Sequence, residues 1–159
     1  MEIEFDIKIN AGVLYDYMLH HTYTSASGLL GTGVGALMIV AFSMQHSVIF
    51  LIAGIVILAY LPWTLFIRSR QQMLANPAFK EPLHYRLDEE GITVSQNETE
   101  EKQSWDQMYK AISTGRSVIV YTSRVNASIF PKKDLGENKA KVIEIISTHM
   151  PPSKVKIRG

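Results

Sequence analysis

The residues of this sequence best suited to hold a metal ion are its histidines, and they are few. His20 and His21 are adjacent, and His46 lies far along the chain. A zinc site needs three or four converging ligands. Neighbouring histidines on a helix point in different directions, and the chain has no cysteine to complete a site. The sequence therefore predicts neither a metal site nor a cofactor.

The acidic run Glu98, Glu100 and Glu101 is the other group of side chains that could carry chemistry, as paired carboxylates. Charged runs in loops are usually solvated, and no nucleophile stands near this one. The Ser27-Gly28 pair and the glycines after it form neither a G-x-S-x-G elbow nor a phosphate-binding loop. We therefore expect no catalytic residue, and a protein that is not an enzyme.

Basic residues collect after the long apolar run and near the end of the chain, where they could face an anionic membrane surface. Each such residue contributes about 1 kcal/mol at that surface. Generic solubility explains the same residues equally well. Nucleic acid is not an expected partner, because the net charge is only +1 and acids are interspersed. The residues assigned to the membrane surface are Arg68, Arg70, Lys132, Lys133, Lys154 and Lys156, with Lys80 and Arg158 beside them.

The position of these basic residues relative to a membrane depends on a stretch without charged residues, 26–67. One bilayer crossing needs roughly 20 apolar residues, so the stretch can cross twice, over about 26–44 and 48–67. The turn at 45–47 is uncharged, whereas Arg68 and Arg70 follow the second crossing, and positive residues stay cytoplasmic. We expect a multi-pass protein of the cell (inner) membrane with both termini cytoplasmic. Tyr60 and Trp63 suit the interface near that end.

Gly31 and Gly35 form a G-x-x-x-G pair on one face of the first crossing. Such a pair permits close approach of another membrane helix. That helix either belongs to another copy of the chain or is the protein's own second crossing, near Ala53 and Gly54. We favour packing within the chain.

Residues 2–10 alternate apolar and polar side chains, which predicts a half-buried strand. Asn10 can cap a short helix over Ala11–His21 that leads into the membrane. A lone strand cannot bury its apolar face, so it needs the sheet expected beyond the apolar stretch. The chain therefore divides into residues 1–25, which join that sheet, a hairpin over 26–67, and a cytoplasmic domain over 68–159.

Six short strands and one helix are expected in the last region. The strands are 83–87, 92–96, 102–105, 107–113, 117–123 and 126–131, and the helix is 138–150. Gly91 would supply a positive φ in the turn 88–91, and 98–101 would be an acidic loop. We assign Trp105 and Tyr109 to the core and Pro131 to a strand-ending turn. The fold class is α+β: a two-helix transmembrane hairpin and a small antiparallel β roll or barrel, pleckstrin-homology-like, closed by a C-terminal helix.

The segment SWDQMYKAISTGRSVIVYTSRVNASIFPKKDL resembles the C-terminal domain of the YcxB-like family of bacterial membrane proteins. In that family a Trp opens a strand, an aromatic residue follows, and a hairpin leads to an I-P-K-K/R turn and a terminal helix. Here these features are Trp105, Tyr109, residues 118–121 and Phe130-Pro131-Lys132-Lys133. The opening EIEFDIKINAGVLYDYMLHH is similar too. The resemblance implies a membrane hairpin holding a pleckstrin-homology-like domain at the inner surface, and it implies no activity.

Two classes of function remain. The first is a non-enzymatic, membrane-anchored interaction or regulatory module that binds a protein partner or itself, and bacteriocin self-immunity is a specific version of it. The alternative is an accessory subunit of a transporter or other membrane complex. The apolar stretch has no charged midplane residue, so a stand-alone transporter is disfavoured. The expected partners are the lipid bilayer with its anionic headgroups, and a protein.

Overall fold

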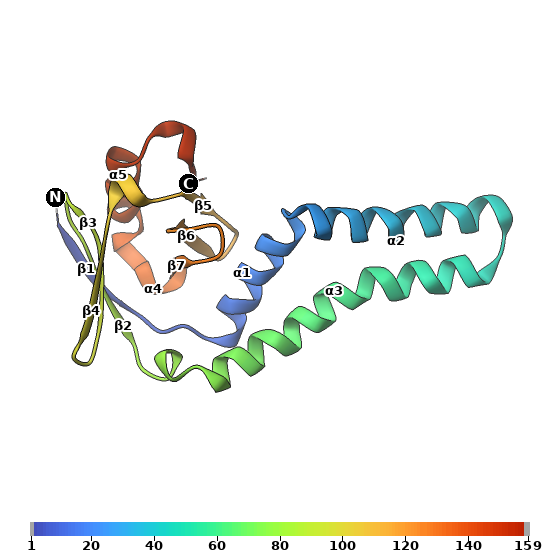
Figure 1. The fold of residues 1–159 in the computed structure, drawn as a ribbon, viewed down its shortest axis with the longest axis horizontal. Coiled ribbons are helices and arrows are strands. Elements are labelled where there is room, and N and C mark those ends of the chain that lie inside the picture. The colour runs from blue at the N-terminus through green and yellow to red at the C-terminus, as the bar shows by residue number, and fades with distance from the viewer. Residues whose placement is uncertain (1, 158–159) are drawn as a thin grey trace.

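The computed structural model describes residues 2–157 and has two parts (Figure 1). Two long antiparallel helices project from a β-rich domain that contains both ends of the described chain. Met1, Arg158 and Gly159 lie outside the described residues, and with them the basic side chain of Arg158.

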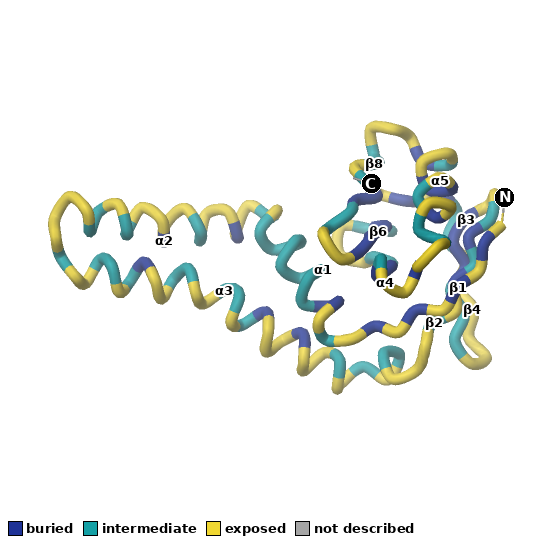
Figure 2. The backbone as a smooth tube through the Cα atoms, turned by 180° about the vertical axis from the view of Figure 1, so that it is seen from behind, coloured by how far each residue is buried: buried dark blue, intermediate teal, exposed yellow. Residues whose placement is uncertain are grey.

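The projecting part consists of α2 (Ala26–Gln45) and α3 (Val48–Ala75), both long and apolar enough to cross a membrane. His46 lies between them in the left-handed region, with a φ of 51°. Most side chains along both helices are exposed, as the tube in Figure 2 shows. The helix α3 continues eight residues past Ile67, so Arg68 and Arg70 lie on a helix rather than in a linker.

Small residues bring the two helices together. A Cβ placed on Gly35 would lie 2.8 Å from Leu58 of α3, and one on Gly54 would lie 3.0 Å from the carbonyl oxygen of Gly35. Gly35 and Gly54 therefore face each other within the chain. Gly31 is packed less tightly, since its nearest neighbour, Leu61, is 3.8 Å away.

The domain contains two four-stranded sheets. The first has the order β1-β2-β3-β4 and is antiparallel throughout, and the second has the order β7-β6-β5-β8 with β5 and β8 parallel. The strands of the first sheet are β1 (Ile3–Ile7), β2 (Leu83–Leu87), β3 (Gly91–Gln96) and β4 (Thr99–Ser104). Those of the second are β5 (Lys110–Ser113), β6 (Ser117–Tyr121), β7 (Ala127–Pro131) and β8 (Val155–Lys156). Within the described residues the strands form two separate sheets and no closed barrel.

The N-terminal strand pairs with the sheet beyond the apolar helices, as its alternation predicts. Ile3 of β1 lies opposite Leu87 of β2, and Ile7 lies opposite Leu83. The Phe5 ring packs edge-on against Phe130 of the second sheet, with ring centroids 5.5 Å apart. The ring of Tyr85 meets the same phenylalanine at 5.0 Å. This aromatic cluster joins the two sheets, and it depends on β1 being in place.

Helices cover the remaining apolar surface. The helix α5 (Lys139–His149) buries Val142, Ile145 and Ile146, and α4 (Lys132–Leu135) precedes it. Trp105 begins a short 3₁₀ turn, Trp105–Gln107, is buried as expected, and donates from Nε1 to the carbonyl of Asp88 at 2.8 Å. Pro131 ends β7, as the sequence predicts. Further 3₁₀ turns lie at Pro77–Phe79, Gly136–Asn138 and Pro152–Lys154.

The helix α1 (Ala11–Tyr23) connects the domain to the long helices. The side chain of Asn10 accepts from the backbone N–H of Val13 at 3.0 Å, which is the predicted cap. Tyr15 packs edge-on against Phe66 of α3, with centroids 5.8 Å apart. The Tyr17 hydroxyl donates to the carbonyl of Val125 in the β6–β7 turn at 3.2 Å. The helix α1 therefore contacts the domain on one side and α3 on another.

Three sequence predictions are wrong. Gly91 begins β3 with no positive φ, and a Cβ there would lie 2.1 Å from the carbonyl oxygen of Gln103. The strand β4 needs this close approach, so glycine is required for space rather than for a turn. The acidic run 98–101 is not a loop, because Thr99 already begins β4. Tyr109 is 46% exposed and does not fill the core.

Replacing Gly91 with alanine should therefore destabilise the domain. Overpacking costs about 1–3 kcal/mol, and here the obstacle is backbone. The melting temperature of the full-length protein in detergent, followed by circular dichroism, should fall by several degrees. Gly115→Ala is the matched control, since a Cβ at Gly115 meets nothing within 4 Å. Equal melting temperatures for the two variants would contradict the crowding at Gly91.

Candidate functional site

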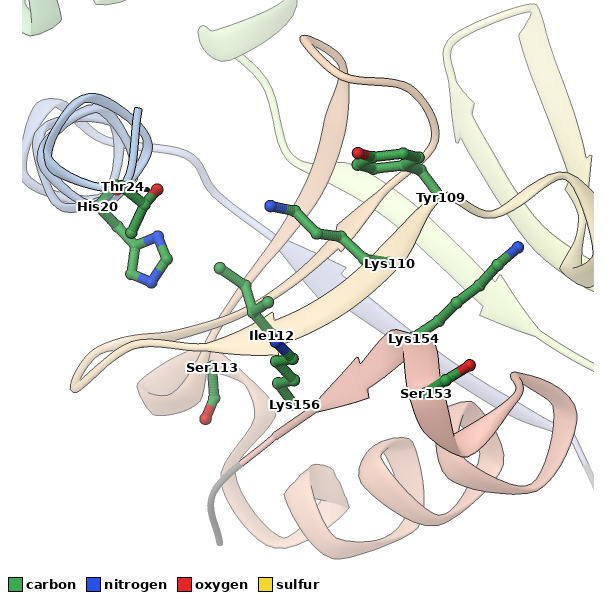
Figure 3. A pocket seen from close by; sticks show the side chains of 9 residues that line it. All are labelled: His20, Thr24, Tyr109, Lys110, Ile112, Ser113, Ser153, Lys154 and Lys156. Carbon is green, nitrogen blue, oxygen red and sulfur yellow. Dashed lines mark hydrogen bonds between the residues drawn. The ribbon is translucent and has the colours of Figure 1, made fainter. Parts of the chain in front are cut away.

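A basic cavity of about 690 Å³ lies between the end of α1 and strands β5 and β8 of the second sheet. Figure 3 shows its lining, which comes from three segments far apart in the sequence: the last residues of α1, strand β5, and the chain from Ser153 to β8. The residues that line it are His20, Thr24, Tyr109, Lys110, Ile112, Ser113, Ser153, Lys154 and Lys156. We call it the basic cavity.

One wall of the basic cavity is formed by a strand pair that joins the middle of the domain to its C-terminal end. The strand β8 runs parallel to β5, with Val155 opposite Ala111 and Lys156 opposite Ile112. Lys154 donates from Nζ to the carbonyl of Met108 at 3.0 Å, which ties the chain before β8 to the chain before β5. The pairing places Lys156 beside Ile112 in the same wall.

The opposite wall is the end of α1, and contacts with the sheet hold it in place. Asp16 accepts a hydrogen bond from the Thr114 hydroxyl at 2.6 Å, at the β5–β6 turn. His21 stacks on Tyr121 of β6 with ring centroids 6.3 Å apart. These contacts hold the end of α1, which carries His20, against the second sheet.

Lys110 is the cation at the centre of the cavity. Its ammonium lies 4.6 Å from the centre of the Tyr121 ring and 5.8 Å from that of Tyr109. Such cation–π contacts orient an ammonium while leaving its charge intact. Figure 3 shows Lys110 pointing toward His20 and Thr24, whereas Lys154 points away from them.

The environment of His20 is unfavourable to a positive charge. Burial lowers the pKa of His20, and the charge of Lys110 and the neighbouring His21 lower it further, while Asp16 acts in the opposite direction. Its Nδ1 atom is buried without a hydrogen-bond partner among the described residues. The side chain is therefore mostly neutral at pH 7 and has an unused polar atom.

This arrangement suits an anion. Three lysines and four hydroxyl-bearing residues line the cavity, and none of its lining residues within 2–157 is acidic. Ammonium and hydroxyl groups are the donors that phosphate, sulfate and carboxylate oxygens accept from. A bound anion would also favour the imidazolium form of His20 and so add one more donor.

The structure divides the basic residues that the sequence grouped together. Lys154 and Lys156 line the basic cavity. Lys132 and Lys133 lie instead beside Asn10 and Gly12, at the other end of α1. The helix has 13 residues, so these two groups are separated by about 18 Å along it.

The basic residues outside the cavity differ in the contacts that they make. Lys132 donates from Nζ to the carbonyl of Thr114 at 2.7 Å, which is a structural contact. Arg68 and Arg70 are exposed on α3, and the Arg70 guanidinium lies 4.6 Å from the centre of the Phe66 ring. The predicted membrane-facing set is therefore three separate groups.

Sequence reasoning missed Lys110, Thr24, Ser113 and Ser153. Lys110 stands alone between Tyr109 and Ala111, and it becomes part of a basic group only through the β5–β8 pairing. The pairing involves only two residues of each strand, and these lie far apart in the sequence. A strand of two residues is too short to show a periodic pattern of apolar side chains. The sequence indicates His20 only as a possible metal ligand, and among the described residues no group of three metal-ligating side chains includes it.

The comparison with protein families matches part of the chain. Residues 87–146 match the family model described as YcxB-like protein. This stretch is YcxB-like. The resemblance that the motifs around Trp105 and Pro131 indicate is thereby confirmed over these residues. No curated protein and no solved structure gives a significant match to the chain.

The YcxB-like stretch runs from the last residue of β2 into α5 and includes Trp105, Tyr109 and Pro131. It contains the β5 wall of the basic cavity, with Lys110, Ile112 and Ser113. It does not contain the α1 wall or the C-terminal wall with Lys154 and Lys156. The basic cavity is therefore assembled from the YcxB-like stretch and from segments on both sides of it.

The effect of the Lys110 charge should be measurable as a change in the pKa of His20. Replacing Lys110 with glutamine removes a charge that disfavours the imidazolium, so the pKa of His20 should rise toward its ordinary value. Titration of the histidine ring protons by NMR, on full-length protein in detergent without added anion, gives the midpoint directly. Lys141→Gln, an exposed change on α5, should leave it unmoved. A midpoint unchanged in Lys110→Gln would contradict the geometry of the basic cavity.

Proposed function

We propose that the protein is a non-enzymatic interaction or regulatory module, anchored in the cell membrane by α2 and α3. The observation that carries the proposal is the apolar surface of these helices, which packing within the chain leaves uncovered. Leu30 is 71% exposed, Met44 78% and Ile49 76%. Surfaces of this extent and composition need a lipid or protein environment.

The position of the domain supports the same proposal. The helix α1 ends two residues before α2, and it packs against α3 near Phe66, which is followed by Arg68 and Arg70. If residues 26–67 lie in the bilayer, the domain rests on the membrane surface. Both termini then lie on the side of the arginines, which the distribution of positive charge makes cytoplasmic.

The architecture of the domain supports a binding role. Two sheets that pack through an aromatic cluster, followed by α5, support the proposal of a pleckstrin-homology-like domain. Folds of that kind serve many functions, so the argument rests on the site rather than on the fold. The site is a cavity lined by cations and hydroxyl groups, which suits the binding of an anionic group rather than its chemical conversion.

A second candidate, an accessory subunit of a larger membrane complex, is favoured by a groove on the long helices. The groove, of about 370 Å³, is lined by Ser27, Gly31, Val56, Ile57, Tyr60 and Leu61. Small residues of this kind admit a further helix. Gly35 is already packed against α3, so Gly31 is the member of the pair that remains accessible to a partner.

Topology provides the first test. Fluorescent-protein and alkaline-phosphatase fusions at residue 1 and at residue 159 should both report a cytoplasmic location, because Arg68 and Arg70 follow the apolar part of α3 while the turn at His46 has no Asp, Glu, Lys or Arg. A phosphatase fusion in the turn should report the opposite side and serves as the control. One external terminus would contradict the hairpin.

Purification from mild detergent separates the two candidates. A module that acts by itself or with its own copies should elute as a monomer or a homo-oligomer. An accessory subunit should retain a heteromeric partner in fixed stoichiometry, and Gly31→Leu should release it by filling the groove. Gly33→Leu is the matched control, since a Cβ at Gly33 meets nothing within 4 Å. A stoichiometric heteromer that depends on Gly31 would replace the first candidate with the second.

A further inference from the structure

We infer that the basic cavity binds the phosphate group of an anionic lipid at the membrane surface, and so makes the domain responsive to headgroup charge. The inference rests on the proposed membrane anchoring. It assigns a ligand class to a site that includes both β5 and the C-terminal end of the described chain.

The cavity lies at the depth of lipid headgroups. Thr24 lines it and precedes Ala26, the first residue of α2, by two positions, which span at most about 7 Å. The polar band of a bilayer is about 5–8 Å thick on each side of the hydrocarbon core. A cavity wall that includes Thr24 and His20 is therefore within reach of a headgroup when α2 begins at the hydrocarbon boundary.

The donors of the cavity suit a phosphate. Lys110 and Lys156 supply charge, while Lys154 is partly engaged by the carbonyl of Met108. Ser153 adds a hydroxyl donor, whereas the Thr24 hydroxyl already donates to the carbonyl of His20 at 2.7 Å. The nearest acid, Asp16, is held by the Thr114 hydroxyl. A phosphate between α1 and β8 would meet the ammonium groups of Lys110 and Lys156 and the hydroxyl of Ser153.

A lipid headgroup is favoured over a free anion by the position of the site. One wall belongs to the end of α1, which is separated from α2 by only two residues, so a phosphate there would lie beside the acyl region. Tyr109 and Ile112 give the cavity an apolar part as well. A headgroup with its glycerol backbone can contact such surface, whereas inorganic phosphate cannot.

The test uses full-length protein in an uncharged detergent and calorimetric titration with three probes. These are dioctanoyl-phosphatidylglycerol, dioctanoyl-phosphatidylcholine and inorganic phosphate. We expect saturable binding of the anionic lipid with one site per chain, at least tenfold tighter than that of the zwitterionic lipid and of phosphate. Added salt should weaken it, because the lysines are partly exposed.

Lys110→Gln with Lys156→Gln should weaken binding of the anionic lipid roughly 30-fold, at about fivefold for each charge. Lys133→Gln with Lys141→Gln removes the same charge far from the basic cavity and should change it less than twofold. Lys110→Arg with Lys156→Arg should retain most of the affinity, which separates lost charge from a damaged fold.

Lowering the pH from 7.5 to 5.5 provides a second measurement. A phosphodiester keeps its single charge over this range, so a change in affinity reports the protein. The titratable and charged groups facing His20 are Lys110 on β5 and Asp16 and His21 on its own helix. A bound anion raises the pKa of His20, so affinity should increase as the pH falls, and His20→Gln should remove that increase.

Several results would overturn the inference. Equal affinity for the two lipids, or an unchanged affinity in the Lys110→Gln, Lys156→Gln variant, would show that the basic cavity does not bind headgroups. Binding of phosphate as tight as that of the anionic lipid would make the ligand a free anion. If the chain stays in the membrane after alkaline extraction while lipid binding fails, only this inference falls. If the chain is extracted, the membrane anchoring falls with it.

Discussion

The pairing of β1 with β2 is the constraint on which the rest of the structure depends. The two strands are neighbours in one sheet, yet residues 8–82 lie between them. Both connections to the long helices therefore begin at the same place in the domain, and α2 and α3 form an insertion between adjacent strands. Closing such a loop costs conformational entropy that grows only slowly with length. The aromatic contacts of Phe5 with Tyr85 and Phe130 offset that cost.

The helix α1 fixes the orientation of the long helices relative to the domain. It contacts two turns of the second sheet through Asp16 and Tyr17, and it packs against α3 through Tyr15. Because α3 also continues toward β2 as far as Ala75, two helices rather than two linkers connect the parts. The basic cavity forms against the end of α1, so its shape depends on how the domain sits on the long helices.

Much of the fold follows from periodicity and composition. The alternation in residues 2–10, the cap at Asn10, the two apolar helices and the fully buried β6 were all predictable, because each is a local pattern with a single physical solution. Gly91 was misassigned because glycine serves two purposes, and the sequence does not show whether positive φ or missing volume is needed. Glu98 to Glu101 suggested a loop, yet β4 is an edge strand where charged side chains are solvated and discourage aggregation. The basic cavity could not be predicted, since Lys110 and Lys156 meet only through a two-residue parallel pairing.

The insertion of α2 and α3 between β1 and β2 also sets an order of events during synthesis. The apolar face of β1 leaves the ribosome first, and its partner follows only after the 75 residues 8–82 have been made. At about 5–20 residues per second this takes roughly 4–15 s. During that interval the strand is an unpaired edge, and Glu2, Glu4, Asp6 and Lys8 on its polar face are its protection against mispairing. The apolar helices are therefore synthesised before the domain can close, which makes completion of the fold a late event.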